Sequence, residues 1–302
     1  MLSSRTPGRR MLRRRRDAPE LRWFTARAWT TKWYPQGIDV GERDGRRTLA
    51  VSWFRQDRTG RHLASRVVMI DPHRARHVDV ALAIEEDGAL VPARIHTGGL
   101  AWFGDRLFVA ATGEGIWEFD LSRVRRVRGR QARTLRGLGR GILPRTALVA
   151  VRTRVHPISL RCSFLGRAFD AEGRPLDRVL IGEYRKDDRG RIGEFEIPAD
   201  ADDDFAEQHR FSPAIPRMQG AVRWGDRHLV SQSHLMEPGI LWSGTPPHLA
   251  RHPEPLPVGC EDLALDPDGR MLWTLGEHPF KRVVRGIPFA RLGLGERSAP
   301  RP

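Results

Sequence analysis

Polar residues recur at one kind of position in this sequence, where an apolar, strand-like segment begins. Five such segments open on a side chain that can form hydrogen bonds: Gln36, His96, Ser163, Gln219 and Glu261. If these positions only closed a core, apolar residues would be expected in at least some of them. The pattern therefore predicts a wet, ligand-accessible pocket where the five segments meet.

A second set of polar residues stands at the end of the segment that follows each opening. Its members are Glu183, His234, Glu277 and His278. Carboxylate oxygens with an occasional imidazole suit a divalent cation such as Ca²⁺ or Mg²⁺, and a water on such a metal can serve hydrolysis. Glu261, Glu183 and His96 are the candidate ligands. Alternatively, Glu183 and Glu277 pair with neighbouring arginines, and His278 turns the chain before a proline.

The chain lacks the short motifs that mark many catalytic sites. It contains neither His-Glu-x-x-His nor Cys-x-x-Cys, which often bind zinc, and it has no Gly-x-Ser-x-Gly elbow. A site assembled from separate repeats would show no such motif. The two cysteines, Cys162 and Cys260, each adjoin an opening residue and can pair with each other, bind a ligand or stay free. We favour free, buried thiols, which behave as small apolar side chains.

Two stretches far apart in the chain share one pattern. Residues 98–113 read GGLAWFGDRLFVAATG, and residues 220–234 read GAVRWGDRHLVSQSH. Each contains a glycine, an apolar residue, a tryptophan and Gly-Asp-Arg before an alternating apolar run. Three more units follow a similar plan, so that the five units start near residues 37, 99, 163, 220 and 262. Self-similarity at a long interval is typical of repeat architectures.

The segments within each unit predict antiparallel strands. They alternate apolar and polar residues and are separated by turns such as Gly-Asp-Arg and Asp-Pro-Asp-Gly. We therefore predict an all-β fold, a single β-propeller with five blades, or six if an irregular blade lies between the second and third units. The last blade would keep an unpaired edge, so we expect an N-terminal strand from residues 21–34 to pair with it and close the ring.

The net charge of +15 is concentrated in two segments. Residues 1–16 hold seven arginines and residues 123–154 hold eleven, both without an acidic residue. The sequence predicts an Arg-rich disordered tail over residues 1–20, a propeller over 21–290 with the Arg-rich stretch as an inter-blade insertion, and a disordered tail over 291–302. Such segments can bind nucleic acid or an acidic surface. Because arginines outnumber lysines 49 to 3, we favour a compositional bias and solvated segments.

Nothing in the sequence indicates passage into or through a membrane. The basic N-terminus is not followed by the apolar core of an export signal, and no stretch reaches the roughly 18 to 20 apolar residues that cross a bilayer. We expect a cytoplasmic monomer from the sequence as written. A wrongly assigned start would hide a signal and make a secreted protein.

Five stretches carry a resemblance to a known group of proteins: WYPQGI, VSWF, HTGGLAWFGDRLFVAATGEGIWEFDL, MQGAV and GCEDLALDPDGRMLWTLGEH. Over roughly residues 30 to 285, the chain resembles a family of uncharacterised, mostly secreted actinomycete β-propellers. More distantly, the last stretch is similar to gluconolactonase and senescence-marker propellers, in which a divalent metal in the channel helps to hydrolyse lactones. This chain has Gln36 where that resemblance implies a metal-binding glutamate in the first blade.

Three functions of different classes remain open. We favour a propeller that binds a small molecule, a glycan or a protein at the mouth of its channel. The alternative is a metal-dependent hydrolase of the lactonase kind. A further alternative is a protein that binds nucleic acid, another polyanion or an envelope surface through its Arg-rich segments, which salt would weaken.

Overall fold

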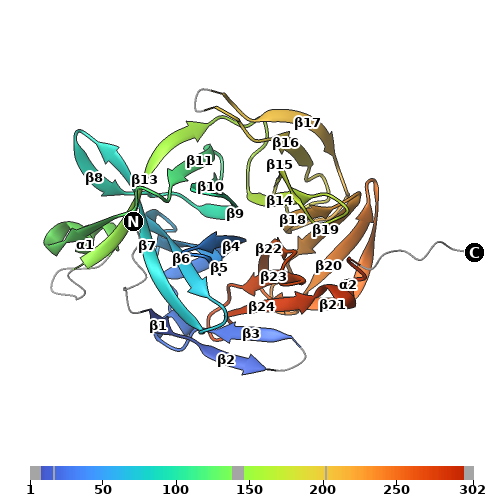
Figure 1. Ribbon diagram of the computed structural model, residues 1–302, viewed down its shortest axis with the longest axis horizontal. Coiled ribbons are helices and arrows are strands. Elements are labelled where there is room, and N and C mark those ends of the chain that lie inside the picture. Colours follow the sequence, from blue (N-terminus) through green and yellow to red (C-terminus); the bar gives the residue numbers. More distant parts are fainter. Residues whose placement is uncertain (1–7, 16–17, 138–145, 201–202, 296–302) are drawn as a thin grey trace, which may run out of the picture.

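The chain folds as an all-β propeller in which antiparallel sheets radiate from a common centre (Figure 1). The computed structural model describes residues 8–15, 18–137, 146–200 and 203–295. Within these ranges the chain is mostly strand, and its helices are a 3₁₀ turn and two short α-helices. The predicted fold class is therefore confirmed.

The strands form five successive antiparallel runs. The first run contains β4 (Trp33–Arg43), β5 (Arg46–Gln56), β6 (His62–Asp71) and β7 (Arg76–Glu86). The second contains β9 (Thr97–Phe103), β10 (Arg106–Ala111), β11 (Gly115–Asp120) and β13 (Thr146–His156). The third contains β14 (Phe164–Phe169), β15 (Pro175–Gly182), β16 (Ile192–Glu196) and β17 (Ala206–Phe211).

The last two runs lead back to the N-terminus. The fourth run contains β18 (Met218–Trp224), β19 (Arg227–Gln232), β20 (Pro238–Thr245) and β21 (His248–Val258). The fifth contains β22 (Cys260–Asp266), β23 (Met271–Gly276), β24 (Val283–Pro288), β3 (Pro19–Arg22) and β2 (Leu12–Arg15). The remaining elements are β1 (Arg9–Arg10), η1 (Ala26–Ala28), β8 (Ala89–Pro92), β12 (Arg125–Arg128), α1 (Gly129–Leu135) and α2 (Phe289–Leu292).

The first strands of the five runs form a closed ring around the centre. Strand β4 contacts β9, β9 contacts β14, β14 contacts β18, β18 contacts β22, and β22 contacts β4. The backbones approach so closely that a Cβ atom on Gly37 would overlap Gly98, and one on Gly99 would overlap Leu165. These close approaches explain why glycines stand where the inner strands of neighbouring runs meet. Parallel pairs also join strands of different runs, β7 to β13 and β14 to β18. Strand pairing therefore does not mark where one blade ends and the next begins, and the count of five blades stays a prediction.

An N-terminal strand closes the fold, as the sequence predicts. Strand β3 pairs with β24, with Leu21 opposite Val284, and β2 pairs with β3 in turn. The closing segment starts earlier than expected, because residues predicted to be a disordered tail form β1, β2 and the first half of β3. The buried side chains of Met11 and Leu21 give this segment an apolar face against the core, which outweighs its positive charge.

The Arg-rich stretch, which we expected to be an insertion between blades, contains regular secondary structure. It forms β12, α1 and β13, while residues 138–145 lie outside the described ranges. Strand β13 completes the second run by pairing with β11, and its first half pairs in parallel with β7. At the other end of the chain, Leu292 and Leu294 are buried although we expected a tail from residue 291. Residues 296–302 lie outside the described ranges.

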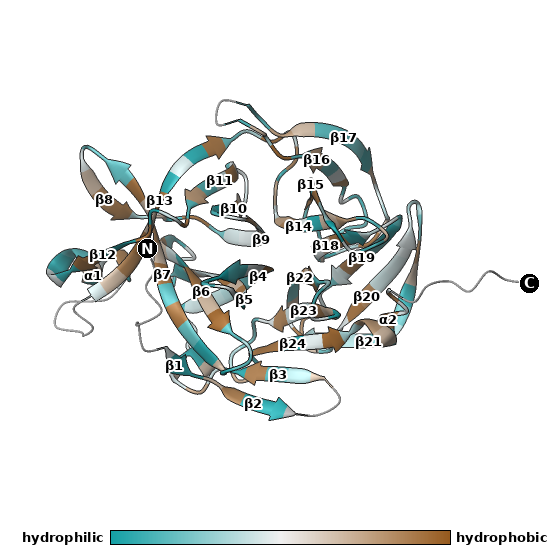
Figure 2. Ribbon diagram, viewed as in Figure 1, coloured by the Kyte–Doolittle hydropathy of each residue, from teal (hydrophilic) through white to brown (hydrophobic). Residues whose placement is uncertain are grey.

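Apolar side chains from neighbouring runs pack against each other between the sheets. Figure 2 shows hydrophobic residues on strands all around the ring. The two repeat tryptophans are one residue apart in the hairpin register, because Trp102 is opposite the second residue of β10 and Trp224 is opposite the first residue of β19. Each indole still packs against a glycine of the preceding run, since a Cβ atom on Gly41 would overlap Trp102 and one on Gly173 would overlap Trp224. Both cysteines are free and buried. Of the helices in the described ranges, none is long and apolar enough to cross a membrane.

Candidate functional site

A cavity of about 550 Å³ lies at the end of the ring where the inner strands begin, which we call the opening end. Six of the nine predicted mouth residues line it: Gln36, His96, Ser163, Gln219, Glu261 and Glu277. The other lining residues are Tyr34, Phe54, Gln56, His62, Thr112, Arg161 and Tyr184. The strand openings thus meet in one place, whereas the functional role of these residues stays a prediction.

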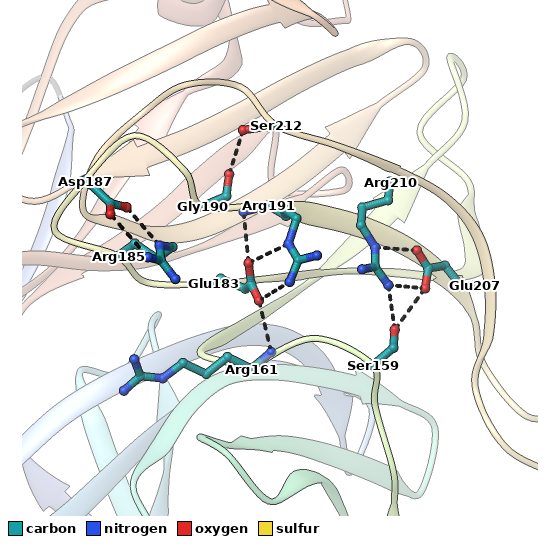
Figure 3. A network of polar contacts seen from close by, with 10 residues as sticks. All are labelled: Ser159, Arg161, Glu183, Arg185, Asp187, Gly190, Arg191, Glu207, Arg210 and Ser212. Carbon is teal, nitrogen blue, oxygen red and sulfur yellow. Dashed lines mark hydrogen bonds and ion pairs between the residues drawn. The ribbon is translucent and has the colours of Figure 1, made fainter.

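Glu183 is bound to arginine beside this cavity and does not line it (Figure 3). Nε and Nη2 of Arg191 each donate to its carboxylate at 3.0 Å, and the backbone N–H groups of Arg161 and Arg191 donate as well. The Arg191 hydrogen bonds hold the pKa of Glu183 below its usual value. The structure therefore agrees with the arginine-paired alternative for Glu183.

The polar contacts around Glu183 hold the loop that follows β15 in place (Figure 3). Arg185 forms an ion pair with Asp187 at 2.8 Å, and the Ser212 hydroxyl donates to the carbonyl of Gly190 at 3.1 Å. Tyr184, which lines the cavity, lies within this fastened loop. The network positions one wall of the cavity.

His234 and His278 also lie outside the cavity lining. The Nδ1 atom of His234 is 3.8 Å from the carboxylate of Glu237 in the turn after β19. The Nε2 atom of His278 contacts the carbonyl oxygen of Leu235 at 2.5 Å. This contact links the turn after β19 to the turn after β23, and a functional role for His278 stays a prediction.

Glu261 is a buried carboxyl group in the cavity. Its side chain accepts a hydrogen bond from Nε2 of Gln219 at 3.2 Å, and the residue is only 3% exposed. Burial raises the pKa of Glu261 well above its ordinary value, and the nearby carboxylates of Glu277 and Asp262 raise it further. The environment therefore favours the neutral, protonated form of Glu261.

Glu277 faces the same cavity from the end of the second strand of the fifth run. It accepts a hydrogen bond from Nε2 of Gln36 at 2.8 Å. Burial raises the pKa of Glu277, although His278, Arg282 and the hydrogen bond from Gln36 oppose the shift. Two carboxyl groups, each held by an amide side chain, thus share the cavity.

Aromatic rings form another wall. Tyr34 and Phe54 stack with ring centres 5.6 Å apart, and Phe54 lies 4.5 Å from the ring of His96. Burial lowers the pKa of His96 to about 4, and its Nδ1 atom lies 3.2 Å from the hydroxyl of Thr112. The pKa of His62 is also lowered by burial. Both imidazoles are therefore neutral at physiological pH.

The sequence analysis did not identify the aromatic side chains that line the cavity, nor Asp262, which lies next to its buried carboxyl groups. Tyr34 is two residues before Gln36, and this period-two spacing along a strand was the available signal. Below the cavity, Asp262 accepts hydrogen bonds from the backbone N–H groups of Ile38 at 3.1 Å and Leu100 at 3.3 Å. Its carboxyl group thus joins three inner strands, and burial raises its pKa well above the usual value.

The predicted metal ligands are not clustered as a ligand set. Within the described residues, Glu261, Glu183 and His96 do not form a group whose ligand atoms all lie close together, and Glu183 is held by Arg191. A divalent cation at this end of the channel stays a prediction.

A second cavity, of about 650 Å³, lies at the opposite end of the ring, where the inner strands finish. We call this the turn end. Its lining includes Arg46, Arg47, Arg167, Asp266 and Asp268. Nε of Arg47 lies 3.0 Å from the carboxylate of Asp266. Paired opposite charges therefore surround this end of the channel.

Comparison with known proteins gives similarity in fold. No protein-family model and no curated protein sequence matches this chain. Solved structures with a similar fold are β-propeller proteins. The Aleuria aurantia lectin, in a mutant bound to alpha-methyl-L-fucoside, is 11% identical, with 82% of this chain and 72% of that chain covered and a TM-score of 0.42.

Two further structures show the same degree of likeness. A GH43_1 enzyme from Xanthomonas citri is 10% identical over 87% of this chain and 92% of its own, with a TM-score of 0.42. The β-propeller domain of Cps50 (Swd1) from Myceliophteria thermophila is 12% identical over 84% of this chain and 96% of its own, with a TM-score of 0.38. Likeness at this level says nothing about activity, and the resemblance to gluconolactonase propellers stays a prediction.

Proposed function

We propose that this propeller binds a small, neutral, hydroxyl-rich ligand, a carbohydrate, in the cavity at the opening end. The observation that carries the proposal is the combination of amide and carboxyl side chains, hydrogen-bonded to each other, with aromatic rings in one cavity of about 550 Å³. Ligand pockets of this size combine aromatic walls with a few convergent polar groups that fix orientation.

The polar groups suit hydroxyl groups as partners. The amides of Gln36 and Gln219 offer both donors and acceptors, and the raised pKa values of Glu261 and Glu277 favour carboxyl groups that can donate as well as accept. Each hydroxyl group of a sugar also donates and accepts. A ligand of this kind can satisfy these groups without the cost of burying a charge.

The aromatic wall suits the less polar face of a sugar ring. Tyr34 and Phe54 provide stacked ring faces, and Tyr184 adds a third ring with a hydroxyl group. Aromatic side chains contribute a large contact area at a small entropic cost, because they have few rotatable bonds. One ligand can therefore contact apolar and polar groups at once.

The binding experiment uses a panel of neutral mono- and oligosaccharides, first on a glycan array and then by calorimetry. We expect Gln219→Ala to weaken binding at least tenfold, because it removes a polar group from the cavity. The matched control is Gln208→Ala, since Gln208 is exposed on β17. Equal affinity in the wild type and Gln219→Ala, or binding of no neutral sugar, would contradict the proposal.

Hydrolysis is the second candidate. Two buried carboxyl groups with raised pKa values are the kind of groups that act as general acids near neutral pH. The same sugars, together with lactones, serve as substrates with and without EDTA and added Ca²⁺, Mg²⁺ or Zn²⁺. Turnover that Glu261→Gln abolishes would favour a hydrolase, and dependence on an added ion would restore the metal-assisted mechanism.

Binding to nucleic acid or an acidic surface is a distinguishable outcome. Arg125, Arg128 and Arg130 are exposed on β12 and α1. A fluorescent oligonucleotide and anionic vesicles test this face directly. Binding that falls steeply with salt and survives Gln219→Ala would place the activity on the Arg-rich stretch instead of the cavity.

A further inference from the structure

We infer that Glu194, His209 and His228 form a binding site for a single Zn²⁺ ion between the third and fourth runs. Each of the three side chains offers one ligand atom, and these atoms all lie within 4.8 Å of one another. The site is separate from the cavity at the opening end and goes beyond the function proposed for it.

Strand register brings the three side chains together. Glu194 on β16 is directly opposite His209 on β17, so the two side chains share one face of the third run. His228 on β19 is likewise opposite Arg223 on β18 in the fourth run. Nη2 of Arg223 donates to Oε1 of Glu194 at 3.0 Å, which joins the two faces.

His228 is buried and keeps one ring nitrogen available for a metal. It is only 4% exposed, and its Nδ1 atom lies 3.3 Å from the backbone carbonyl oxygen of Asp226. With Nδ1–H donating to that carbonyl, the Nε2 lone pair is left for a metal, as in many histidine sites. Nε2 is buried and has no hydrogen-bond partner among the described residues, which is costly for a polar atom.

Glu194 is held in place while one oxygen remains available. Arg178 donates to Oε1 at 3.2 Å, and Arg223 donates to the same oxygen, so both arginines leave Oε2 open. The Glu194 side chain is 2% exposed, so its orientation is fixed. The two guanidinium groups also repel a cation, so the affinity should be lower than that of a closed structural zinc site.

The ligand chemistry favours zinc over calcium or magnesium. Two imidazoles and one carboxylate are a common zinc set, whereas Ca²⁺ and Mg²⁺ require mostly oxygen ligands. Three protein ligands leave the fourth position of a tetrahedral ion for water. The site borders a cavity of about 470 Å³, lined also by Thr245 and Pro246, and His209 is exposed, so ions can reach it from solvent.

The test measures binding of Zn²⁺ to the full chain by calorimetry after removal of metals with EDTA. We expect one ion per chain and at least a tenfold loss of affinity in His209→Ala. Because His209 is exposed, this change should leave the fold intact. His248→Ala is the matched control, since His248 is an exposed histidine on β21, and its affinity should equal that of the wild type.

Cobalt provides an independent measure of geometry. Co²⁺ in the wild type should give the visible absorption of a tetrahedral ion, and His228→Ala should remove it while circular dichroism reports whether the fold persists. Equal Zn²⁺ affinity in His209→Ala and the wild type would overturn the inference. So would Ca²⁺ binding at the same site as tightly as Zn²⁺.

Discussion

The two ends of the inner-strand ring differ in the groups that surround their carboxyl side chains. At the opening end, Glu261 and Glu277 have raised pKa values and His96 has a lowered one, so the surroundings favour neutral groups. At the turn end, burial also raises the pKa of Asp266, but Nε of Arg47 lies 3.0 Å from this carboxylate, forms an ion pair with it and opposes the shift. The same five strands thus produce a cavity whose carboxyl groups accept hydrogen bonds from amide side chains at one end, and a cavity with an arginine–aspartate ion pair at the other.

In our proposal the opening end binds a ligand, and the turn end contributes to stability. The repeat tryptophans pack near the turn end, where Gly41 and Gly173 both border the cavity. The opening end instead buries carboxyl groups at a cost in free energy. Groups that cost stability and face a cavity are typical of functional sites.

The largest expected effect is at the turn end. Trp102→Ala should reduce the free energy of unfolding by about 3–5 kcal/mol, because it leaves a large gap against Gly41. Trp224→Ala should follow the same trend, with a smaller loss since Trp224 is partly exposed. Gln219→Ala at the opening end should change stability far less. Urea unfolding measures all three, and a loss below about 1 kcal/mol for both tryptophans would break the comparison.

A smaller effect, of opposite sign, is expected at Glu261. Its folded pKa is raised above the ordinary value of 4.5, so the folded state loses stability relative to the unfolded state as the pH rises above that value. Glu261→Gln removes this penalty. The variant should be more stable than the wild type at pH 8, and the difference should shrink toward pH 4. Thermal unfolding across this range checks the trend. If the stability difference between the variant and the wild type does not change with pH, Glu261 has the same pKa in the folded and the unfolded protein.

The smallest effect concerns the loop beside the opening end. The side chain of Arg191 is 46% exposed, so its ion pair with Glu183 is screened by water. Arg191→Ala should cost less than about 1 kcal/mol in stability. If the loop positions Tyr184, ligand affinity should fall more than stability does. Stability by denaturation and affinity by calorimetry on the same samples separate the two, and an unchanged affinity would remove this loop from the site.

Much of the fold could be predicted because it depends on local patterns. The repeated Gly-Asp-Arg turns and alternating apolar residues identified the strands, and the unpaired edge of the last run predicted the closing N-terminal strand. The predicted tail over residues 1–20 included β1 and β2, because its arginine content gave no sign that Met11 is buried. A charged segment still forms a strand when its alternate side chains reach a core and its backbone pairs with an open edge.

The candidate site was predictable in part. Strand openings identified Gln36, Gln219 and Glu261, because inner strands of successive repeats begin at the same end of a ring. Glu183 and Glu277 have equivalent places at the ends of second strands, yet Glu277 lines the cavity whereas Glu183 binds Arg191 eight residues further along. A repeat pattern does not indicate which side chain a carboxylate will bind.

The sequence by itself determined the strands, their repeat and the polar character of one end of the channel, since these depend on neighbours along the chain. Only the tertiary structure decided which carboxyl groups have raised pKa values and which histidines meet. The pKa of Glu261 depends on burial by several strands, and His209 and His228 come together across two separate runs. Desolvation and contact between distant strands are properties of the packed molecule, so no local pattern encodes them.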